Sequence, residues 1–325
     1  MLVLSAPEVR SVLDLDRLVD AVEAAMVELS SGRVSMPARV AANVIERDGL
    51  LAAMPAYLSA AGALTTKLVS LFPHNTDRPT HQALICCFDP DNGTPLAVLD
   101  GTEVTAARTA AGSALAARLL ARADSAVVAV IGTGVQARAH ARALIRLAGV
   151  ELIVCAGRDR SKVAALVDQL VTAGIPATAA ASIEAAVRGA DVVCAATHAD
   201  QPVVRRRWLR PGTHINSVGY NTSGFGEVDL DTIRDALVVV ESRAAALAAP
   251  PAGAIELRRA VSDGVLGVDH VVEIGEIASR RTDGRRDDTQ LTLYKSVGVA
   301  VQDAAAAALI LHLAQQRRIG TQIRI

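Results

Sequence analysis

Residues 126–137 read AVVAVIGTGVQA, and they decide the fold that we expect for this chain. The apolar run before Gly132 predicts a buried strand, and VQARAHARALIRLAG at 135–149 predicts a helix directly after the turn. Gly132 lets the chain turn sharply, Gly134 lets the backbone approach a pyrophosphate, and Ala137 is small enough for the helix to pack on the strand. The helix would aim its free N–H groups and positive dipole end at the phosphates. The turn therefore predicts a dinucleotide site, against the alternative of a turn that binds nothing.

Strand-like apolar runs recur around this turn, with helical stretches between them. This alternation implies right-handed βαβ crossovers and a mostly parallel, doubly wound sheet. We therefore expect an α/β fold with a Rossmann-type domain over residues 112–299. The expected strands are AVVAVIG (126–132), ELIVCAG (151–157), GIPATAA (174–180), ADVVCAAT (190–197), THINSVG (213–219) and ALVVVES (236–242).

Residues 1–111 have a different texture and predict an α+β domain. Ser5 and Glu8 form a capping box that predicts a short helix, and the apolar positions of 14–32 follow the period of a second helix. Between 34 and 101, short β-prone runs alternate with Pro, Asn, Asp and Gly residues, which predicts an antiparallel sheet.

The stretch TLYKSVGVAVQDAAAAALILHLAQQ (292–316) reads as one long helix after the last strands. We expect this end of the chain to pack back on the first domain. That domain would then comprise residues 1–111 together with about 300–325.

Composition and charge exclude several classes of partner. The chain has 325 residues, 51% hydrophobic but only 2% aromatic, as in α/β cores built from Ala, Val, Leu and Ile. Its 33 Lys and Arg against 34 Asp and Glu give a formal net charge of -1, which attracts neither nucleic acid nor an anionic membrane. No apolar run is long enough to span a membrane, and no basic segment precedes an apolar run at the amino terminus. We expect a cytoplasmic protein.

Neither the cysteines nor the histidines are spaced as metal ligands. The four cysteines contain no C-x-x-C pair, and two of them are adjacent, so we expect reduced thiols. The seven histidines form no pattern that places two ligands on one helix face. We predict no metal.

We expect the residues that select between NAD(H) and NADP(H) at the end of the second strand, where the sequence reads CAGRDRSK (155–162). An acidic residue there accepts the ribose 2′-hydroxyl of NAD(H), whereas arginine accommodates the 2′-phosphate of NADP(H). Arg158 and Arg160, with Ser161, suit a dianionic phosphate, and Asp159 is one residue beyond the usual acidic position. We therefore favour NADP(H) over NAD(H). The alternative is that these residues cap the next helix.

Three cations stand in apolar surroundings of the first domain: Arg39, Lys67 and Arg108. Burial of Lys67 in its β-prone run would lower its pKa and let it exchange a proton near neutral pH. The two arginines suit bidentate binding of a substrate carboxylate. Surface positions for all three are the alternative that periodicity alone leaves open.

Five segments together resemble the ornithine cyclodeaminase/mu-crystallin family, in family order and over nearly the whole chain. They are AAMPAYLSAAGALTTKLVSLFP (52–73), GTPLAVLDGTEVTAARTAAGSALAARLLA (93–121), VIGTGVQA (130–137), PGTHINSVGYN (211–221) and YKSVGVAVQDAAAA (294–307). The resemblance implies a homodimer of two-domain subunits. In each subunit a Rossmann domain would accompany a domain that forms both the dimer interface and the substrate pocket.

The resemblance also assigns roles to residues. Lys67 matches the family's catalytic lysine, and Arg39 and Arg108 match the arginines that hold the substrate carboxylate. Gly132, Gly134 and Gln136 match the phosphate loop. The predicted substrate-binding residues are therefore Arg39, Lys67 and Arg108, and the predicted cofactor-binding residues are Arg108, Thr109, Gly132, Thr133, Gly134, Val135, Gln136, Arg158, Arg160, Ser161, Thr197, Val218 and Gly219.

Asn221 is a departure from part of the family. Cyclodeaminases and related alanine dehydrogenases carry an aspartate at this position, and mu-crystallin-like ketimine reductases lack it. An amide takes no proton at neutral pH, so Asn221, predicted to lie among the catalytic residues, disfavours deamination of ornithine.

The resulting hypothesis is an NAD(P)H-dependent ketimine reductase. It would reduce a cyclic imino acid of the pyrroline- or piperideine-2-carboxylate type to an L-amino acid. Two alternatives stay open: a redox-neutral ornithine or lysine cyclodeaminase, and a crystallin-like protein that binds NADP and a small ligand without turnover.

Overall fold

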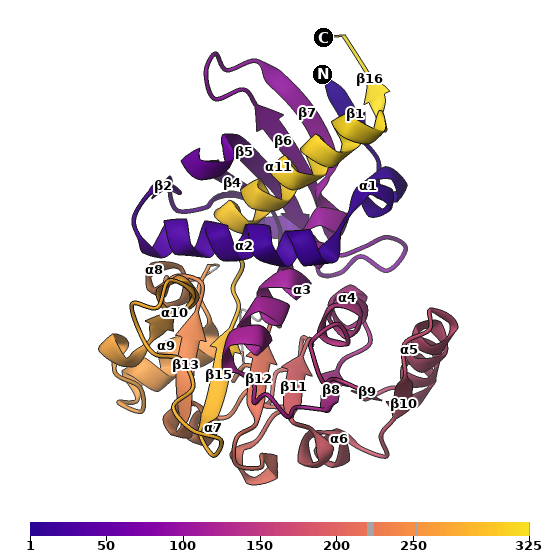
Figure 1. Ribbon diagram of the computed structural model, residues 1–325. Coiled ribbons are helices and arrows are strands. Elements are labelled where there is room, and N and C mark those ends of the chain that lie inside the picture. The colour runs from indigo at the N-terminus through magenta and orange to yellow at the C-terminus, as the bar shows by residue number, and fades with distance from the viewer. Residues whose placement is uncertain (220–223, 251, 325) are drawn as a thin grey trace. The chain divides into compact units, whose positions relative to one another are not determined.

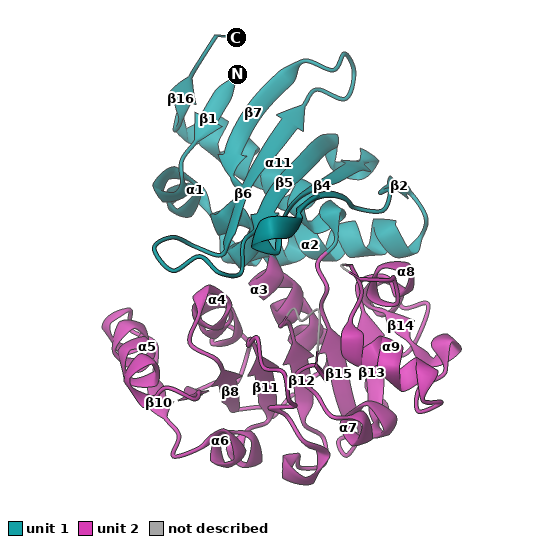
Figure 2. Ribbon diagram, turned by 180° about the vertical axis from the view of Figure 1, so that it is seen from behind, with its two compact units in different colours: residues 1–108, 299–325 teal, residues 109–298 magenta. Residues whose placement is uncertain are grey.

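The computed structural model describes residues 1–219, 224–250 and 252–324 (Figure 1). The chain divides into two compact units, residues 1–108 with 299–325 and residues 109–298 (Figure 2). Helix α3 (Gly101–Leu120) carries the chain from the first unit into the second.

The first unit is built on a mainly antiparallel sheet with the order β16-β1-β7-β6-β5-β4-β2, in which β3 also pairs with β4. The ladder from β4 to β7 is antiparallel, as the short β-prone runs predict, and β1 pairs with β7 in parallel. The strands are β1 (Leu2–Leu4), β2 (Val34–Ser35), β3 (Val40–Val44), β4 (Gly49–Leu58), β5 (Ala63–Leu71), β6 (His81–Phe88), β7 (Pro95–Asp100) and β16 (Thr321–Gln322).

Three helices accompany this sheet: α1 (Ala6–Val12), α2 (Leu15–Ser30) and α11 (Ala300–Arg317). Figure 1 shows α11, from the carboxyl end of the chain, lying beside α2 on one face of the sheet. Strands β4 and β5 turn alternate side chains to this face, because successive strand residues point in opposite directions. Met54 of β4 and Lys67 of β5 are buried on it. The alanine run of α11 adds little bulk, so the helix packs closely on the strands.

The second unit is an eight-stranded sheet with the order β10-β9-β8-β11-β12-β15-β13-β14 (Figure 2). All of its strand pairs are parallel. The order reverses between β8 and β11, which is the topological switch point at which such sheets bind ligands. This arrangement confirms the expected doubly wound α/β class. The strands are β8 (Val127–Ile131), β9 (Leu152–Ala156), β10 (Ala177–Ala179), β11 (Val192–Ala195), β12 (His214–Ser217), β13 (Ala236–Val240), β14 (Val272–Glu273) and β15 (Leu291–Lys295).

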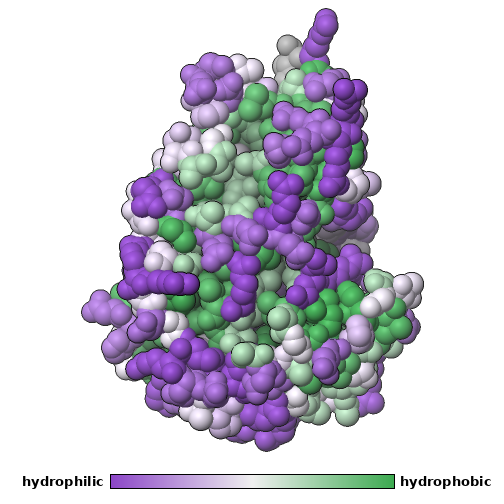
Figure 3. Space-filling view, in the orientation of Figure 1, coloured by the Kyte–Doolittle hydropathy of each residue, from purple (hydrophilic) through white to green (hydrophobic). Residues whose placement is uncertain are grey.

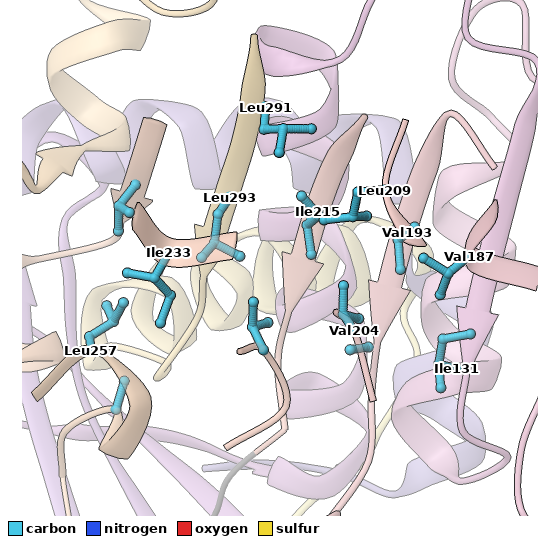
Figure 4. Packing of buried hydrophobic residues seen from close by; sticks show 14 of the residues in the cluster. Ile131, Val187, Val193, Val204, Leu209, Ile215, Ile233, Leu257, Leu291 and Leu293 are labelled. Carbon is cyan, nitrogen blue, oxygen red and sulfur yellow. The ribbon is translucent and has the colours of Figure 1, made fainter. Parts of the chain in front are cut away.

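Helices cover both faces of this sheet, so the strands are apolar in both directions. In β8, for example, Ile131 packs into one core cluster and Val130 into the other. Figure 4 shows the larger cluster, which extends from Ile131 to Leu257 across the sheet. The helices are α4 (Val135–Leu144), α5 (Arg160–Thr172), α6 (Ile183–Gly189), α7 (Leu230–Asp235), α8 (Arg243–Ala246), α9 (Ile255–Ser262) and α10 (Ile274–Ala278).

One expectation was wrong. The first residues of the expected helix over 292–316 instead belong to β15 (Leu291–Lys295), which pairs with β12 on one side and β13 on the other. The run LTLYK is buried throughout, and a short, fully buried strand cannot be told from a buried helix by periodicity alone. Gly298, with φ +69°, separates this strand from α11.

The surface carries no dominant patch of one kind on the face that Figure 3 draws, where hydrophilic and hydrophobic residues are intermixed. Within the described ranges, every helix is too short or too polar to cross a lipid bilayer. The cysteines are free thiols: Cys87, Cys155 and Cys194 are buried, and Cys86 is partly so.

Candidate active site

Three of the predicted residues belong to one charged cluster of the first unit. Lys67 lies in the middle of β5, and only 3% of it is exposed. Its Nζ lies 2.7 Å from Oδ2 of Asp303, in the first turn of α11. Arg108 of α3 donates from Nε to the other oxygen, Oδ1, at 2.9 Å, and from a terminal nitrogen to Oε1 of Gln302 at 3.1 Å.

The ionisation of this cluster depends on burial. Desolvation lowers the pKa of Lys67 to about 8; the Asp303 carboxylate opposes this fall, and the charges of Arg108 and Arg39 add to it. Arg39 itself is half-buried, between β2 and β3. Burial alone would raise the pKa of Asp303, but Arg108 and Lys67 together hold it below its ordinary value. At neutral pH the cluster therefore holds a protonated lysine that needs little driving force to lose its proton.

The predicted glycine turn lies at the carboxyl end of β8 in the second unit. Gly132 has φ +118°, and a Cβ there would lie 2.4 Å from the carbonyl oxygen of Ala196, at the end of β11. Gly134 is the N-cap of α4, and a Cβ there would meet nothing within 4 Å. Ala137 is fully buried against the sheet, as its small size predicts.

This turn fits a dinucleotide phosphate. A glycine N-cap supplies no side-chain acceptor to the first N–H groups of α4, and the space beside Gly134 is open, as a phosphate at a helix N-terminus requires. Oε1 of Gln136 is a buried acceptor for which the described chain supplies no donor. Thr133 is half-buried beside Gly134, and Val135 is exposed.

The segment after β9 shows whether its residues cap the next helix. Asp159 is the N-cap of α5, because its Oδ1 accepts from the backbone N–H groups of Ser161 and Lys162 and from the Ser161 hydroxyl at 2.6 Å. The helix-capping interpretation of Asp159 is therefore right. Arg158 and Arg160 are exposed on either side of it.

A buried carboxylate joins the ends of β11 and β12. Oε1 of Glu227 accepts from both the backbone N–H and the hydroxyl of Thr197, and Oε2 accepts from the Ser217 hydroxyl and from the Gly219 N–H at 2.7 Å. Glu227 is fully buried. A Cβ on Gly219 would lie only 2.2 Å from the Thr197 carbonyl oxygen, so the two strand ends are in close contact.

Lys295 holds the same segment from its other side. Its Nζ donates to the Gly219 carbonyl oxygen at 2.8 Å and to the Ser217 hydroxyl at 3.2 Å. The ammonium pairs with Glu256, 2.9 Å away, and both side chains are buried. The carboxyl edge of β11, β12 and β15 is therefore fixed by hydrogen bonds from buried charges.

The structure thus brings Arg39, Lys67 and Arg108 together in one unit. Most of the predicted cofactor residues lie at or just beyond strand ends of the other unit, whereas Arg108 and Thr109 lie in α3. Thr109 is buried in α3, and Val218 follows β12. Asn221 lies outside the described residues. Sequence reasoning did not single out Asp303, Gln302 or Glu227. Asp303 gave a signal, because it is the only charged residue between Ala300 and Leu311. Among the described residues, no group of acidic, histidine and cysteine side chains is arranged to hold a metal ion.

Comparisons with known proteins agree on one family. A model of the ornithine cyclodeaminase/mu-crystallin family matches residues 1–317. The chain is 37% identical over 313 residues to the ketimine reductase mu-crystallin of Mus musculus, which covers 94% of this chain and 95% of the mouse protein.

Two solved structures share the fold over essentially their full lengths. The Delta(1)-pyrroline-2-carboxylate reductase of Thermococcus litoralis, in complex with NADH and L-proline, has a TM-score of 0.93 and 34% identity, with 99% of this chain and 100% of that chain covered. An archaeal alanine dehydrogenase dimer with bound NAD has a TM-score of 0.91 and 34% identity, with 100% and 99% covered.

We predict that Glu227→Gln destabilises the second unit. Four groups of the described chain donate hydrogen bonds to the Glu227 carboxylate, so an amide NH2 in place of one oxygen leaves buried donors without an acceptor, at a cost of about 1–3 kcal/mol. The midpoint of thermal unfolding should be several degrees lower than that of the unsubstituted protein. Glu151→Gln, on an exposed glutamate of the same unit, is the matched control and should leave the midpoint unchanged. Equal midpoints for both variants would contradict this role of Glu227.

Proposed function

Because this chain belongs to the ornithine cyclodeaminase/mu-crystallin family, we propose that it is an NAD(P)H-dependent ketimine reductase. Its substrate is a small cyclic imino acid of the pyrroline- or piperideine-2-carboxylate type, and its product is the corresponding L-amino acid. Two relatives support this substrate class by their names, the mouse ketimine reductase and the Thermococcus litoralis Delta(1)-pyrroline-2-carboxylate reductase.

The observation that carries the proposal is the buried pair of Lys67 and Arg108. Reduction of a C=N bond requires a proton for the nitrogen as well as a hydride for the carbon. A lysine with a pKa of about 8 is protonated at neutral pH and still gives up its proton readily. A guanidinium in the same cluster suits the carboxylate that every substrate of this class carries.

The chain's residues divide the reaction as follows. Arg108, together with Arg39, binds the carboxylate and fixes the imine in place. The N–H groups of the first turn of α4, beside Gly134, hold the pyrophosphate of the dinucleotide. Bound NAD(P)H supplies the hydride that adds to the imine carbon. Lys67 gives its proton to the nitrogen as the C=N π bond breaks, and it recovers a proton from water after product release.

The test of this function is an assay of the purified protein with both cyclic imines and both reduced nucleotides. We expect one reduced nucleotide to be consumed for each imine and the L-amino acid to be formed. The near-ultraviolet absorbance of the reduced nucleotide measures its consumption. A cyclodeaminase would instead convert ornithine or lysine with no net change in that absorbance, and a crystallin-like binding protein would bind nucleotide without turnover. Either result would contradict the proposal.

Lys67→Met should lower kcat by at least about 100-fold, because removal of a general acid typically costs that factor or more. In the unsubstituted protein, kcat/KM should fall as the pH rises through about 8, because only the ammonium form of Lys67 donates a proton. A pH–rate profile from neutral to alkaline pH measures this. Undiminished turnover in Lys67→Met would remove the proposed proton donor.

The preferred nucleotide is NADP(H). Arg158 and Arg160 are exposed at the end of β9, and the nearby acid, Asp159, is engaged in capping α5. Two guanidinium groups with no competing free carboxylate favour the 2′-phosphate.

Arg158→Ala should therefore raise KM for NADPH by about 10-fold or more and leave KM for NADH nearly unchanged, since a hydrogen bond to a charged group contributes about 1.5–3 kcal/mol. Arg188→Ala, at an arginine of α6 with an exposed side chain, is the control with no expected effect on either KM. Equal losses for both nucleotides would overturn the preference.

The chain acts as a homodimer, in which a second copy covers the outer face of the sheet of the first unit. Four large apolar side chains on or beside this face are exposed: Leu51 (50%), Leu84 (50%), Val40 (65%) and Ile45 (81%). Across the sheet, Leu84 of β6 pairs with Leu68 of β5, and Leu68 pairs in turn with Ala53 of β4. The apolar residues are therefore contiguous. A continuous apolar face of this kind is typical of a buried interface. The related alanine dehydrogenase is a dimer.

Leu84→Asp should convert the dimer to a monomer, because each subunit would bury an unpaired carboxylate in the apolar interface. Molar mass by light scattering, measured over a range of concentrations, reports the change. Val171→Asp, at a 55% exposed valine of α5 in the other unit, should leave the mass of the dimer unchanged. A monomeric mass before any substitution would contradict the proposal.

A further inference from the structure

Asp303 has no part in the proposed reaction, yet it contacts two of the residues that do. One oxygen faces Lys67 Nζ at 2.7 Å and the other accepts from Arg108 Nε at 2.9 Å. All three side chains are at most 5% exposed. A carboxylate buried to this degree needs partners for its charge, and here both partners are predicted to bind substrate.

The surroundings of Lys67 make Asp303 the decisive charge. On the neighbouring strands, its ladder partners are Met54 of β4 and Ile85 of β6, which carry no charge. Arg108 of α3 and Arg39, between β2 and β3, are both positive, and both act to remove the proton from Lys67. Asp303 of α11 is the anion that opposes them. Without it, a desolvated ammonium would stand beside cations only.

We infer that Asp303 is the positioning residue of this site: it keeps Lys67 charged as a proton donor and holds the guanidinium plane of Arg108 for the substrate carboxylate. The inference rests on the proposed function, because it gives Lys67 and Arg108 the roles assigned there. Asp303 itself is assigned no contact with the substrate or the nucleotide; it acts through Lys67 and Arg108.

The geometry explains why this residue is a short acid. Each carboxylate oxygen meets a different cation, so one planar group forms an ion pair with both. Gln302, the preceding residue of α11, accepts from a terminal nitrogen of Arg108 and so fixes the same guanidinium at a second point. An amide at position 303 would keep the shape but lose the charge, and it would turn an NH2 group towards one of the two cations.

The experiment titrates Lys67 directly. The chain contains three lysines, Lys67, Lys162 and Lys295, so the ¹³Cε resonances of ¹³C-lysine-labelled protein form a simple spectrum that Lys67→Arg assigns. We expect the midpoint of Lys67 in Asp303→Asn to fall by about 1–3 pH units, the usual effect of an adjacent opposite charge. The alkaline limb of kcat/KM against pH should move by the same amount.

Further variants separate this role from a merely structural one. Asp303→Glu retains the charge and should bring the midpoint back towards that of the unsubstituted protein, although kcat falls because the cations are displaced. Asp91→Asn, in the exposed turn between β6 and β7, is the matched control and should shift neither quantity. If Asp303→Asn does not fold, Asp303→Ser supplies a smaller neutral residue for the same titration.

The outcomes are distinct. An unchanged Lys67 midpoint in the neutral variants overturns the role of Asp303, even if the protein reduces imines. A lowered midpoint with an unmoved pH–rate profile also overturns it, because Lys67 would then not act through Asp303. Because the titration needs no turnover, a protein that reduces none of the imines refutes the proposed function separately.

Discussion

The shared carboxylate of Asp303 is the interaction on which the first unit depends. It joins the middle of β5, the first half of α3 and the carboxyl-terminal helix at one buried point. Removing one partner of a buried ion pair leaves the other charge unpaired in a poorly polarisable interior. The resulting loss of folding free energy is larger than the net contribution of the pair itself. The return of α11 to the first sheet is therefore not only a matter of apolar packing, because the helix also brings the anion that two buried cations require.

Much of the fold was predictable because its signals are local. The six expected runs between residues 126 and 242 all form strands of the parallel sheet, since buried strands separated by helices leave a regular pattern in the sequence. β15 was missed because its five buried residues adjoin an alanine-rich helix and share its apolar character. Only its pairing with β12 and β13, which lie far from it in sequence, makes it a strand.

The candidate site was predictable in part, for the same reason. Lys67 and Arg108 attract attention as cations in apolar runs, but the acid that pairs with them is 195 residues from Arg108 along the chain. Glu227 likewise becomes meaningful only when β11 and β12 are adjacent and their ends supply four donors. Spacing in sequence identifies the residues that stand out in their own segment. It does not identify the partner that arrives through the topology.

The burial of two of the three lysines also affects the acid–base behaviour of the whole molecule. Lys162 has an exposed side chain, whereas Lys67 and Lys295 are buried. Of the 33 basic side chains only these three are lysines, so almost all of the exposed basic groups are guanidinium groups. Guanidinium keeps its proton at any pH at which a protein remains folded. The outer charge of the molecule is therefore nearly constant under mildly alkaline conditions, where the interior ammonium of Lys67 titrates. Among the basic side chains, the one that changes its charge in this range therefore lies beneath the surface.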